Sequence, residues 1–472
     1  MKDRTSQIQL HHLYRRIGFS GIPSKNSSLK KAINKFFKDS ESYSALNYQS
    51  LSGGREGGGN MGMDSMKSAE ENEDQKKLKQ KMNRENIRKL NIAWVDKMAT
   101  GEGVFRERMA LFWHGHFACR VDNPEFVHSY IETIRKHALG NFGEMLLAVS
   151  REPAMLQFLN NQQNRKNRPN ENFAREVMEL FTMGIGNYTE SDVKEAARAF
   201  TGWGFNKEGS FEFKQNIHDK NDKKFLGNQG NFQGEDIIRM LLQKKETAHF
   251  VTTKIYRSFV SENYDKNRVD KLAEGFYTSG YDISSLMRNI LEADWFYENA
   301  PTNLLIKSPV ELMVGIQRTL NATFTDFDSM LYVQKVLGQL LFYPPNVAGW
   351  PGGRNWIDSS SLLFRMQLPA MMAGSADIKV KAKDSGDVND LAVNRSKKDG
   401  KAIIDWNKWA EEFKKIETEK LPDLLVSQLL AASPSPDVMK LLYDIKITDS
   451  DRPQYIRKLT LAVMSLPEYQ IA

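Results

Sequence analysis

The sequence predicts a mainly α protein, and three observations carry that prediction. Apolar residues recur at helical spacing through most of the chain between residues 100 and 370. Helix start signals precede several of these stretches, and only one segment has the alternating pattern of a strand. We therefore expect one helical, bundle-like body over residues 1–472, with a small β-hairpin and two flexible inserts.

Four helix starts can be placed from capping residues. An asparagine, serine or threonine accepts hydrogen bonds from the first free backbone N–H groups of a helix, and proline fits its first turn. An acidic residue three positions later completes a capping box. These signals occur at Asn123-Pro124, at Asn141 with Glu144, at Thr189 with Asp192, and at Ser308-Pro309 with Glu311.

Two segments are too polar and too rich in glycine or charge to pack. The first, residues 40–75, contains "SLSGGREGGGNMGMDS", and the second covers residues 380–401. They bracket a central core at 100–370 that holds the motifs, and a C-terminal helical segment follows at 403–472. Within the core, the alternation of Phe211 and Phe213 predicts the small hairpin in the segment Ser210–Gly227.

Composition excludes several classes of protein. The chain has 66 basic and 59 acidic residues, and eight basic residues against two acidic ones lie between Lys76 and Lys97. Without a recognisable motif or interleaved aromatic residues, this cluster indicates a solvated helix face and no nucleic-acid partner. The single cysteine, Cys119, makes no internal disulfide, and there is no run of about 18 apolar residues or leader. We expect a soluble cytoplasmic protein, or alternatively one exported together with a partner.

The stretch "ALFWHGHFACR" carries His114 and His116 on either side of a glycine. If Val104–His116 is one helix, His116 shares an apolar stripe with Phe112, whereas His114 points about 160° away. An intact helix therefore predicts one core histidine and one surface histidine. If the helix ends near Gly115, both rings could bind one divalent metal such as zinc, iron or manganese.

A second polar concentration follows in "RPNENFAREVMELFTMGIG", where we expect a helix from near Asn170 to near Gly184. Glu171, Arg175 and Glu179 recur at spacings of four, with Glu176 beside them. This pattern is typical of an exposed ion-pair ladder. Carboxylates near histidines are also metal ligands and acid and base groups of hydrolases.

Two further places carry polar or aromatic candidates. In "IHDK", Asp219 could orient His218, or the pair could cap a turn, which we favour. The proline- and glycine-rich loop Tyr343–Trp356 carries Trp350, Arg354 and Trp356. These side chains either form a recognition surface or fasten the loop to the helical body.

Six segments together resemble a bacterial family catalogued as domain of unknown function 1800. The segments that carry the resemblance, in order along nearly the whole chain, are "HHLYRRIGFS", "LFWHGHF", "RKHALGNFGEMLLAVSREPAMLQFLNN", "NENFAREVMELFTMGIGNYTESDVKEAARAFTGW", "HDKNDKKFLG" and "LFYPPNVAGWPGGRNWIDSSSLLFR". The opening segment ends in Ser20, where the family more often has glycine. The resemblance implies a mostly helical protein and brings no established reaction, cofactor or catalytic residue. It also implies a partner, since such genes often neighbour those of the sulfatase-like uncharacterised family 1501.

Two functions follow as hypotheses. The first is an accessory or scaffold protein that binds an exported partner protein or a polysaccharide through the loop Tyr343–Trp356. The alternative is a metal-dependent hydrolase or oxidoreductase. Its cleft would join the histidines and the acidic helix, and its expected residues are His114, His116, Glu171, Arg175, Glu176 and Glu179, with His218 and Asp219 on the rim. Nucleotide-binding glycine motifs, serine-hydrolase elbows and cysteine metal patterns do not occur in the sequence.

Overall fold

The computed structural model describes residues 2–24, 27–48, 69–298, 303–375, 401–445 and 451–472. Within these residues it contains twenty-one α-helices and three two-stranded sheets, which confirms the mainly α prediction. Most of the two predicted inserts, residues 49–68 and 380–400, lies outside the described residues. The first insert ends earlier than predicted, because a helix already begins at Ala69.

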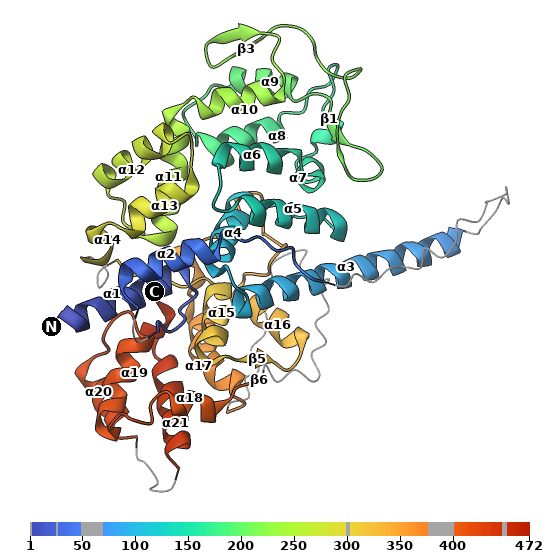
Figure 1. The fold of residues 1–472 in the computed structure, drawn as a ribbon. Coiled ribbons are helices and arrows are strands. Elements are labelled where there is room, and N and C mark those ends of the chain that lie inside the picture. Colours follow the sequence, from blue (N-terminus) through green and yellow to red (C-terminus); the bar gives the residue numbers. More distant parts are fainter. Residues whose placement is uncertain (1, 25–26, 49–68, 299–302, 376–400, 446–450) are drawn as a thin grey trace.

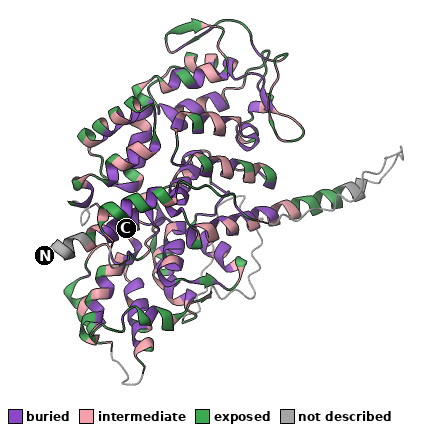
Figure 2. Ribbon diagram, viewed as in Figure 1, coloured by how far each residue is buried: buried purple, intermediate pink, exposed green. Residues whose placement is uncertain are grey.

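The first five helices form the middle of the molecule (Figure 1). They are α1 (Lys2–Ile17), α2 (Leu29–Asp39), α3 (Ala69–Thr100), α4 (Val104–His116) and α5 (Pro124–His137). The first half of α3 projects from the body, and Figure 2 shows exposure giving way to burial along it. Lys79 and Lys81 are exposed there, whereas Trp94 and Val95 are buried, so the basic cluster begins on a solvated helix as predicted.

The next nine helices build the upper part of the view in Figure 1. They are α6 (Phe142–Arg151), α7 (Pro153–Phe158), α8 (Asn172–Glu176), α9 (Glu190–Ala199), α10 (Gly234–Leu242), α11 (Lys245–Phe259), α12 (Lys266–Thr278), α13 (Ile283–Leu291) and α14 (Asp294–Glu298). A π-helix, Val177–Thr182, continues directly from α8. It packs against α11, which in turn packs along α12.

The chain then crosses to the lower part of the view. The helices there are α15 (Pro309–Leu320), α16 (Phe327–Leu337), α17 (Ser359–Met372), α18 (Trp406–Glu411), α19 (Leu421–Leu429), α20 (Pro436–Tyr443) and α21 (Arg452–Met464). All four predicted starts are confirmed. Asn123 and Asn141 accept N-cap hydrogen bonds, and Thr189 with Asp192 and Ser308 with Glu311 form complete capping boxes.

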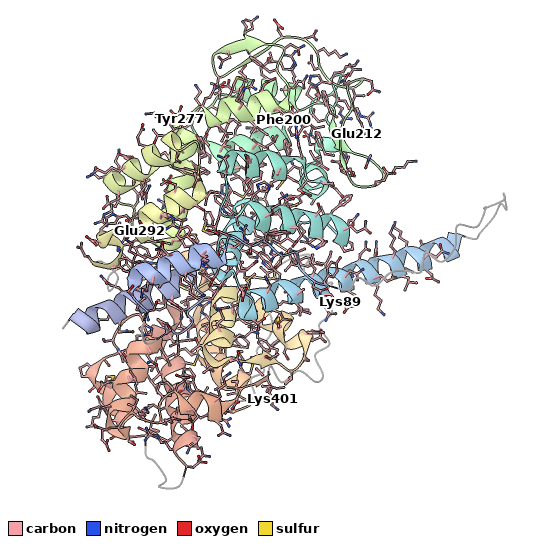
Figure 3. The ribbon with its side chains drawn as sticks, in the orientation of Figure 1. Lys89, Phe200, Glu212, Tyr277, Glu292 and Lys401 are labelled. Atoms are coloured by element: carbon pink, nitrogen blue, oxygen red, sulfur yellow. The ribbon has the colours of Figure 1, made fainter. Side chains whose placement is uncertain are left out.

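The segment predicted as one hairpin supplies one strand to each of two hairpins. β1 (Trp203–Phe205) pairs with β2 (Phe211–Phe213), and β3 (Lys223–Phe225) pairs with β4 (Asn228–Gly230). The second turn explains this difference, because Leu226 and Gly227 both have positive φ, as a tight hairpin turn requires. The third sheet joins β5 (Thr323–Phe324) to β6 (Ala402–Ile403). Glu212 of β2 and Phe200 before β1 are labelled in Figure 3; Glu212 is exposed, whereas Phe200 is fully buried.

Candidate functional site

Helix α4 runs unbroken from Val104 to His116, so Gly115 does not end it. His114 is nevertheless fully buried, and the prediction of a surface position is wrong for this histidine. The reason is that α4 is covered on both faces. His114 packs against Trp94 on one side and Trp350 on the other, with ring centroids 5.4 and 5.2 Å away.

The ring of His114 fastens the loop that follows Phe342. Its Nε2 accepts the backbone N–H of Phe342 at 3.2 Å, and its Nδ1 lies 3.5 Å from the hydroxyl of Tyr130. Burial lowers the pKa of His114 to about 3, so the ring is neutral at physiological pH. A hydrogen bond from Phe342 therefore occupies the lone pair that a metal ion would need.

The glycine between the histidines lies against a second glycine in the loop. Gly349 has a φ of 84°, and a Cβ placed on it would lie 2.4 Å from the carbonyl oxygen of Gly115. Only a residue without a side chain allows this approach. The "HGH" and "AGW" segments are therefore packed backbone to backbone.

His116 fastens a different element, the π-helix. Its Nε2 lies 3.1 Å from the carbonyl oxygen of Phe181, and its Nδ1 lies 3.3 Å from the ammonium of Lys254. Lys254 also donates to the carbonyl oxygen of Leu180 at 3.0 Å. His116 thus donates through Nε2 and accepts through Nδ1. Burial, with the nearby Lys254 charge, holds the pKa of His116 well below its usual value.

The two histidines therefore contact different elements, and the structure does not place free lone pairs of both rings at one site. In the described part of the chain, no three His, Cys, Asp or Glu side chains are grouped to hold a metal ion. Lys254 and the π-helix were not predicted. Burial lowers the pKa of Lys254 to about 8. The π-helix is also of interest, because π-helical turns frequently occur at functional sites.

The acidic residues of the predicted cleft make their contacts with side chains other than His114 and His116. Arg175 pairs with Glu171 at 3.1 Å, as the spacing of four predicts, but its second partner is Glu190 at 2.7 Å. Glu179 instead accepts a hydrogen bond from Tyr188 at 2.8 Å. The wider π-helical turn takes Glu179 out of the 3.6-residue register on which the predicted ladder depends.

Glu176 has no ion pair among the described residues, and burial and the Glu179 charge raise its pKa. His218 and Asp219 take part in turn chemistry. His218 Nδ1 lies 2.8 Å from the carbonyl oxygen of Thr201, and Asp219 pairs with Arg198 at 2.7 Å. Asp219 also accepts the N–H of Asn221 two residues on. Asp219 therefore orients Arg198 and does not orient His218.

The aromatic residues of the loop Tyr343–Trp356 face inward. Trp356 is buried, Trp350 is half-buried against His114, and Tyr343 is also buried. Arg354 is the exposed member, with 92% of its side chain accessible and only a 4.0 Å approach to Glu262. Of the two interpretations of this loop, the geometry favours attachment of the tryptophans to the helical body.

A loop that the sequence analysis did not single out is held in a fixed shape by buried asparagines. Asn164 is 1% exposed, donates to Ala197 and Asn161, and accepts the backbone N–H of Asn170. Asn161 is fully buried and donates to the carbonyl oxygens at Phe200 and Trp203. Asn161 and Asn164 thus anchor the loop between residues 160 and 171 at its base by side-chain hydrogen bonds.

This loop presents two arginines at its outer turn. Arg165 and Arg168 face each other across an antiparallel bridge, closed by a 2.9 Å hydrogen bond from Arg168 N–H to the carbonyl oxygen of Arg165. Bridged residues point to the same side, so the two positive charges lie together. Neither forms an ion pair with a described residue, and both are exposed. The sequence signal is the run "NNQQNRKNRPNEN", whose asparagines favour loop-anchoring hydrogen bonds.

The two arginines line a surface depression of about 830 Å³. Its remaining walls are polar or proline, and the lining residues are Gln163, Arg165, Arg168, Pro169, Asn170, Glu171 and Asn172. Glu171 is the one predicted site residue in this set. We call this surface the Arg165 turn site.

Comparison with known proteins identifies a family that matches nearly the whole chain. A family model described as "Protein of unknown function (DUF1800)" matches residues 12–471. No curated protein and no solved structure matches the chain. No helix of the described chain is long and apolar enough to cross a membrane.

Proposed function

The chain belongs to the DUF1800 family, whose description assigns no activity, and from that premise we propose a function for its own surface. We propose that the protein is an accessory protein that binds an acidic polysaccharide at the Arg165 turn site. The single observation that carries this proposal is a pair of bridged arginines, Arg165 and Arg168, on one side of a hydrogen-bonded loop.

The charge arrangement supports an anionic ligand. Like charges directly opposite each other across a bridge destabilise it, so Arg165 and Arg168 cost stability in the free protein. A carboxylate or sulfate between them removes that repulsion. The planar guanidinium fork matches such groups with two parallel hydrogen bonds.

The rest of the lining supports a sugar backbone between the charged groups. Gln163, Asn170 and Asn172 line the site with amide groups, which both donate and accept hydrogen bonds, as sugar hydroxyl groups do. Asn170 Oδ1 already accepts the N–H of Asn172, and Asn172 Nδ2 donates to Leu159 O, so the other amide atoms are those offered to a sugar. The loop needs little ordering on binding, because Asn164 and Asn161 already fix its backbone. A preorganised site loses less conformational entropy when the ligand binds.

This proposal moves the binding surface predicted at the loop Tyr343–Trp356 to another loop. Trp350 and Trp356 face the helical body, so they present little ring surface to a sugar. The partner protein implied by the family resemblance, a product of family 1501, remains a second ligand to test. Binding an extracellular polysaccharide also requires that the protein be exported with such a partner, which we propose as its location.

Isothermal titration with three polymers tests the proposal. We expect polygalacturonate, which carries carboxylates, or dextran sulfate to bind, and neutral dextran not to bind. The double variant Arg165→Gln/Arg168→Gln should weaken binding by about tenfold or more, since each charge-assisted pair contributes about 1.5–3 kcal/mol.

A matched control separates this site from general attraction to polyanions. Lys79→Gln/Lys81→Gln removes two charges from exposed lysines in the first half of α3. It should change affinity less than threefold at about 0.15 M salt, where exposed charges are screened beyond about 8 Å. An equal loss in both double variants would show nonspecific binding, and binding of only the family 1501 protein would replace the polysaccharide.

A further inference from the structure

Five cationic side chains from distant parts of the chain are buried together beside Glu311. Arg15 and Arg16 come from α1, Arg108 from α4, Lys307 from the residue before the N-cap of α15, and Arg365 from α17. Each is at most 9% exposed, and Arg365 is not exposed at all. We call this group the Glu311 cation cluster.

Glu311 is the carboxylate that acts on these cations. It pairs with Arg108 at 2.5 Å, and its other oxygen accepts the backbone N–H of Ser308 in the capping box of α15. A capping carboxylate already compensates the positive end of its helix. This carboxylate therefore acts on four cations, Arg16, Arg108, Lys307 and Arg365, as well as on a helix N-terminus.

The other hydrogen bonds of the cluster go to neutral carbonyl oxygens. Arg15 donates to Leu430 at 3.0 Å and Lys307 donates to Tyr469 at 2.7 Å. Arg365 donates to the carbonyl oxygen of Lys307 at 2.5 Å. These contacts tie α1 and α15 to the C-terminal segment, but a carbonyl oxygen does not neutralise a charge.

The cations lie close enough to act on one another. Burial and the charges of Arg15 and Arg365 lower the pKa of Lys307 to about 7, although Glu311 raises it. Burial, with Arg15 and Arg108, lowers the pKa of Arg16 to about 9 against the opposing effect of Glu311. The positive charges of neighbouring cluster members therefore lower the pKa of both Lys307 and Arg16.

Several donors of the cluster point to no described acceptor. The buried nitrogens without a hydrogen-bond partner in the described chain are Arg15 Nε, Arg16 Nε and Nη1, Arg108 Nε and Arg365 Nη1. Each buried donor left without an acceptor costs about 1–3 kcal/mol, and more where the group is charged. An anion among these side chains would supply acceptors to the donors that lack them.

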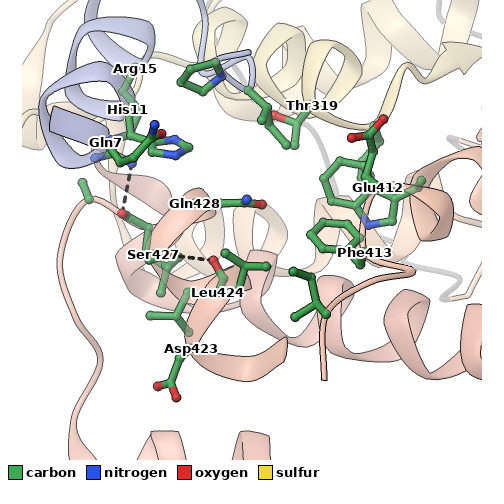
Figure 4. A pocket seen from close by; sticks show the side chains of 18 of the residues that line it. Gln7, His11, Arg15, Thr319, Glu412, Phe413, Asp423, Leu424, Ser427 and Gln428 are labelled. Carbon is green, nitrogen blue, oxygen red and sulfur yellow. Dashed lines mark hydrogen bonds between the residues drawn. The ribbon is translucent and has the colours of Figure 1, made fainter. Parts of the chain in front are cut away.

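We propose that the Glu311 cation cluster binds a doubly charged tetrahedral oxyanion, of the phosphate or sulfate class. This site is distinct from the Arg165 turn site and does not depend on it. A cavity of about 1650 Å³ lies beside Arg15, and Figure 4 shows Arg15 and His11 of α1 facing it across from Gln428 of α19. Of the five cations, Arg15 is the one that lines this cavity, so the proposed route of the ion passes this side chain. The cavity leaves room for a larger molecule that bears the oxyanion.

Equilibrium dialysis of the full chain with radiolabelled sulfate, and separately with phosphate, measures the site. We expect one saturable ion per chain, with a Kd of about 1 mM or lower at constant ionic strength. Chloride should not compete, and the stronger of the two arms identifies the preferred ion. Absence of saturable binding in both arms, with no sulfate or phosphate released from the denatured purified protein, overturns the proposal.

Matched variants locate the ion. Lys307→Met keeps an unbranched side chain and removes its charge, and Arg365→Gln removes the charge and shortens a buried donor. Each should weaken binding at least tenfold, whereas Arg257→Gln, at an exposed arginine of α11, should leave it unchanged. Equal binding in all three variants overturns the proposal. If a cluster variant does not fold, wild-type crystals soaked in selenate decide, since the anomalous peak must lie among the five side chains.

Discussion

Each residue of the "HGH" segment makes a different contact that stabilises the fold. His114 accepts a hydrogen bond from the backbone of Phe342, Gly115 packs against the backbone of Gly349, and His116 donates to the π-helix. Periodicity predicted a helix over Val104–His116 as one of two alternatives, the other ending near Gly115, and the structure has the longer helix. The burial of His114 could not be predicted, because it depends on Trp94 and Trp350, which lie far from it in the sequence.

Substitution of Gly349 tests the close approach between the two glycines. Gly349→Ala places a Cβ 2.4 Å from Gly115 O in a backbone with positive φ, so we expect a loss of about 2–4 kcal/mol in the free energy of unfolding. Gly352→Ala is the control, since nothing lies within 4 Å of its Cβ, and it should change stability by less than about 0.5 kcal/mol. Urea unfolding measures both. Equal effects would contradict the packing described for Gly349.

Buried histidines predict acid sensitivity. Burial, with the Arg15 charge, lowers the pKa of His11 to about 4, and burial lowers that of His114 to about 3. The unfolded chain takes up protons near pH 6.5, whereas the folded chain does not until these lower values. Their stabilising contribution is therefore complete above about pH 6.5 and is lost as the pH falls, by up to about 1.4 kcal/mol per pH unit for each histidine.

Urea unfolding between pH 6.5 and 5 measures this loss. His114→Gln keeps an acceptor for Phe342 and removes one titrating group, so the slope of stability against pH should fall by about one proton. His249→Gln, at a histidine with 41% of its side chain exposed, is the control. An unchanged slope in His114→Gln would mean that His114 is protonated in the folded protein.

At the scale of elements, capping residues predicted where helices begin, because those signals are local in sequence. The π-helix Val177–Thr182 was missed, since a 3.6-residue register was assumed through it, and this error misplaced Glu179. The loop at 160–171 was missed because its shape depends on contacts with Ala197, Phe200 and Trp203. Periodicity contains no information about such contacts.

The anchoring of this loop predicts a stability effect. Asn164→Ala removes three hydrogen bonds from a buried site and leaves the Ala197 carbonyl oxygen and the Asn170 N–H unsatisfied. We expect a loss of about 2–4 kcal/mol in the free energy of unfolding and weaker polysaccharide binding. Asn167→Ala, at an exposed position of the same loop, should affect neither by more than about 0.5 kcal/mol. Calorimetric unfolding and isothermal titration measure the two effects, and equal losses in both variants would contradict the anchoring role.

At the scale of the whole molecule, the mainly α architecture follows from periodicity and caps, while the charged interior does not. Residues 15, 108, 307 and 365 meet only because α1, α4, α15 and α17 converge, and each arginine read alone in the sequence looks like a surface residue. The same convergence attaches the C-terminal segment to α1 through Arg15 and Leu430. Lys307, which donates to Tyr469, makes a second contact to the segment 403–472.

Backbone hydrogen exchange with and without saturating polygalacturonate or dextran sulfate, whichever binds, tests the proposed function most directly. The polymer should slow exchange of amides in residues 159–172, and the Arg165→Gln/Arg168→Gln variant should abolish that protection. Residues 343–357 and the exposed half of α3 should exchange at the same rate with and without polymer. Protection confined to 343–357 or to α3, with none at 159–172, would contradict binding at the Arg165 turn site.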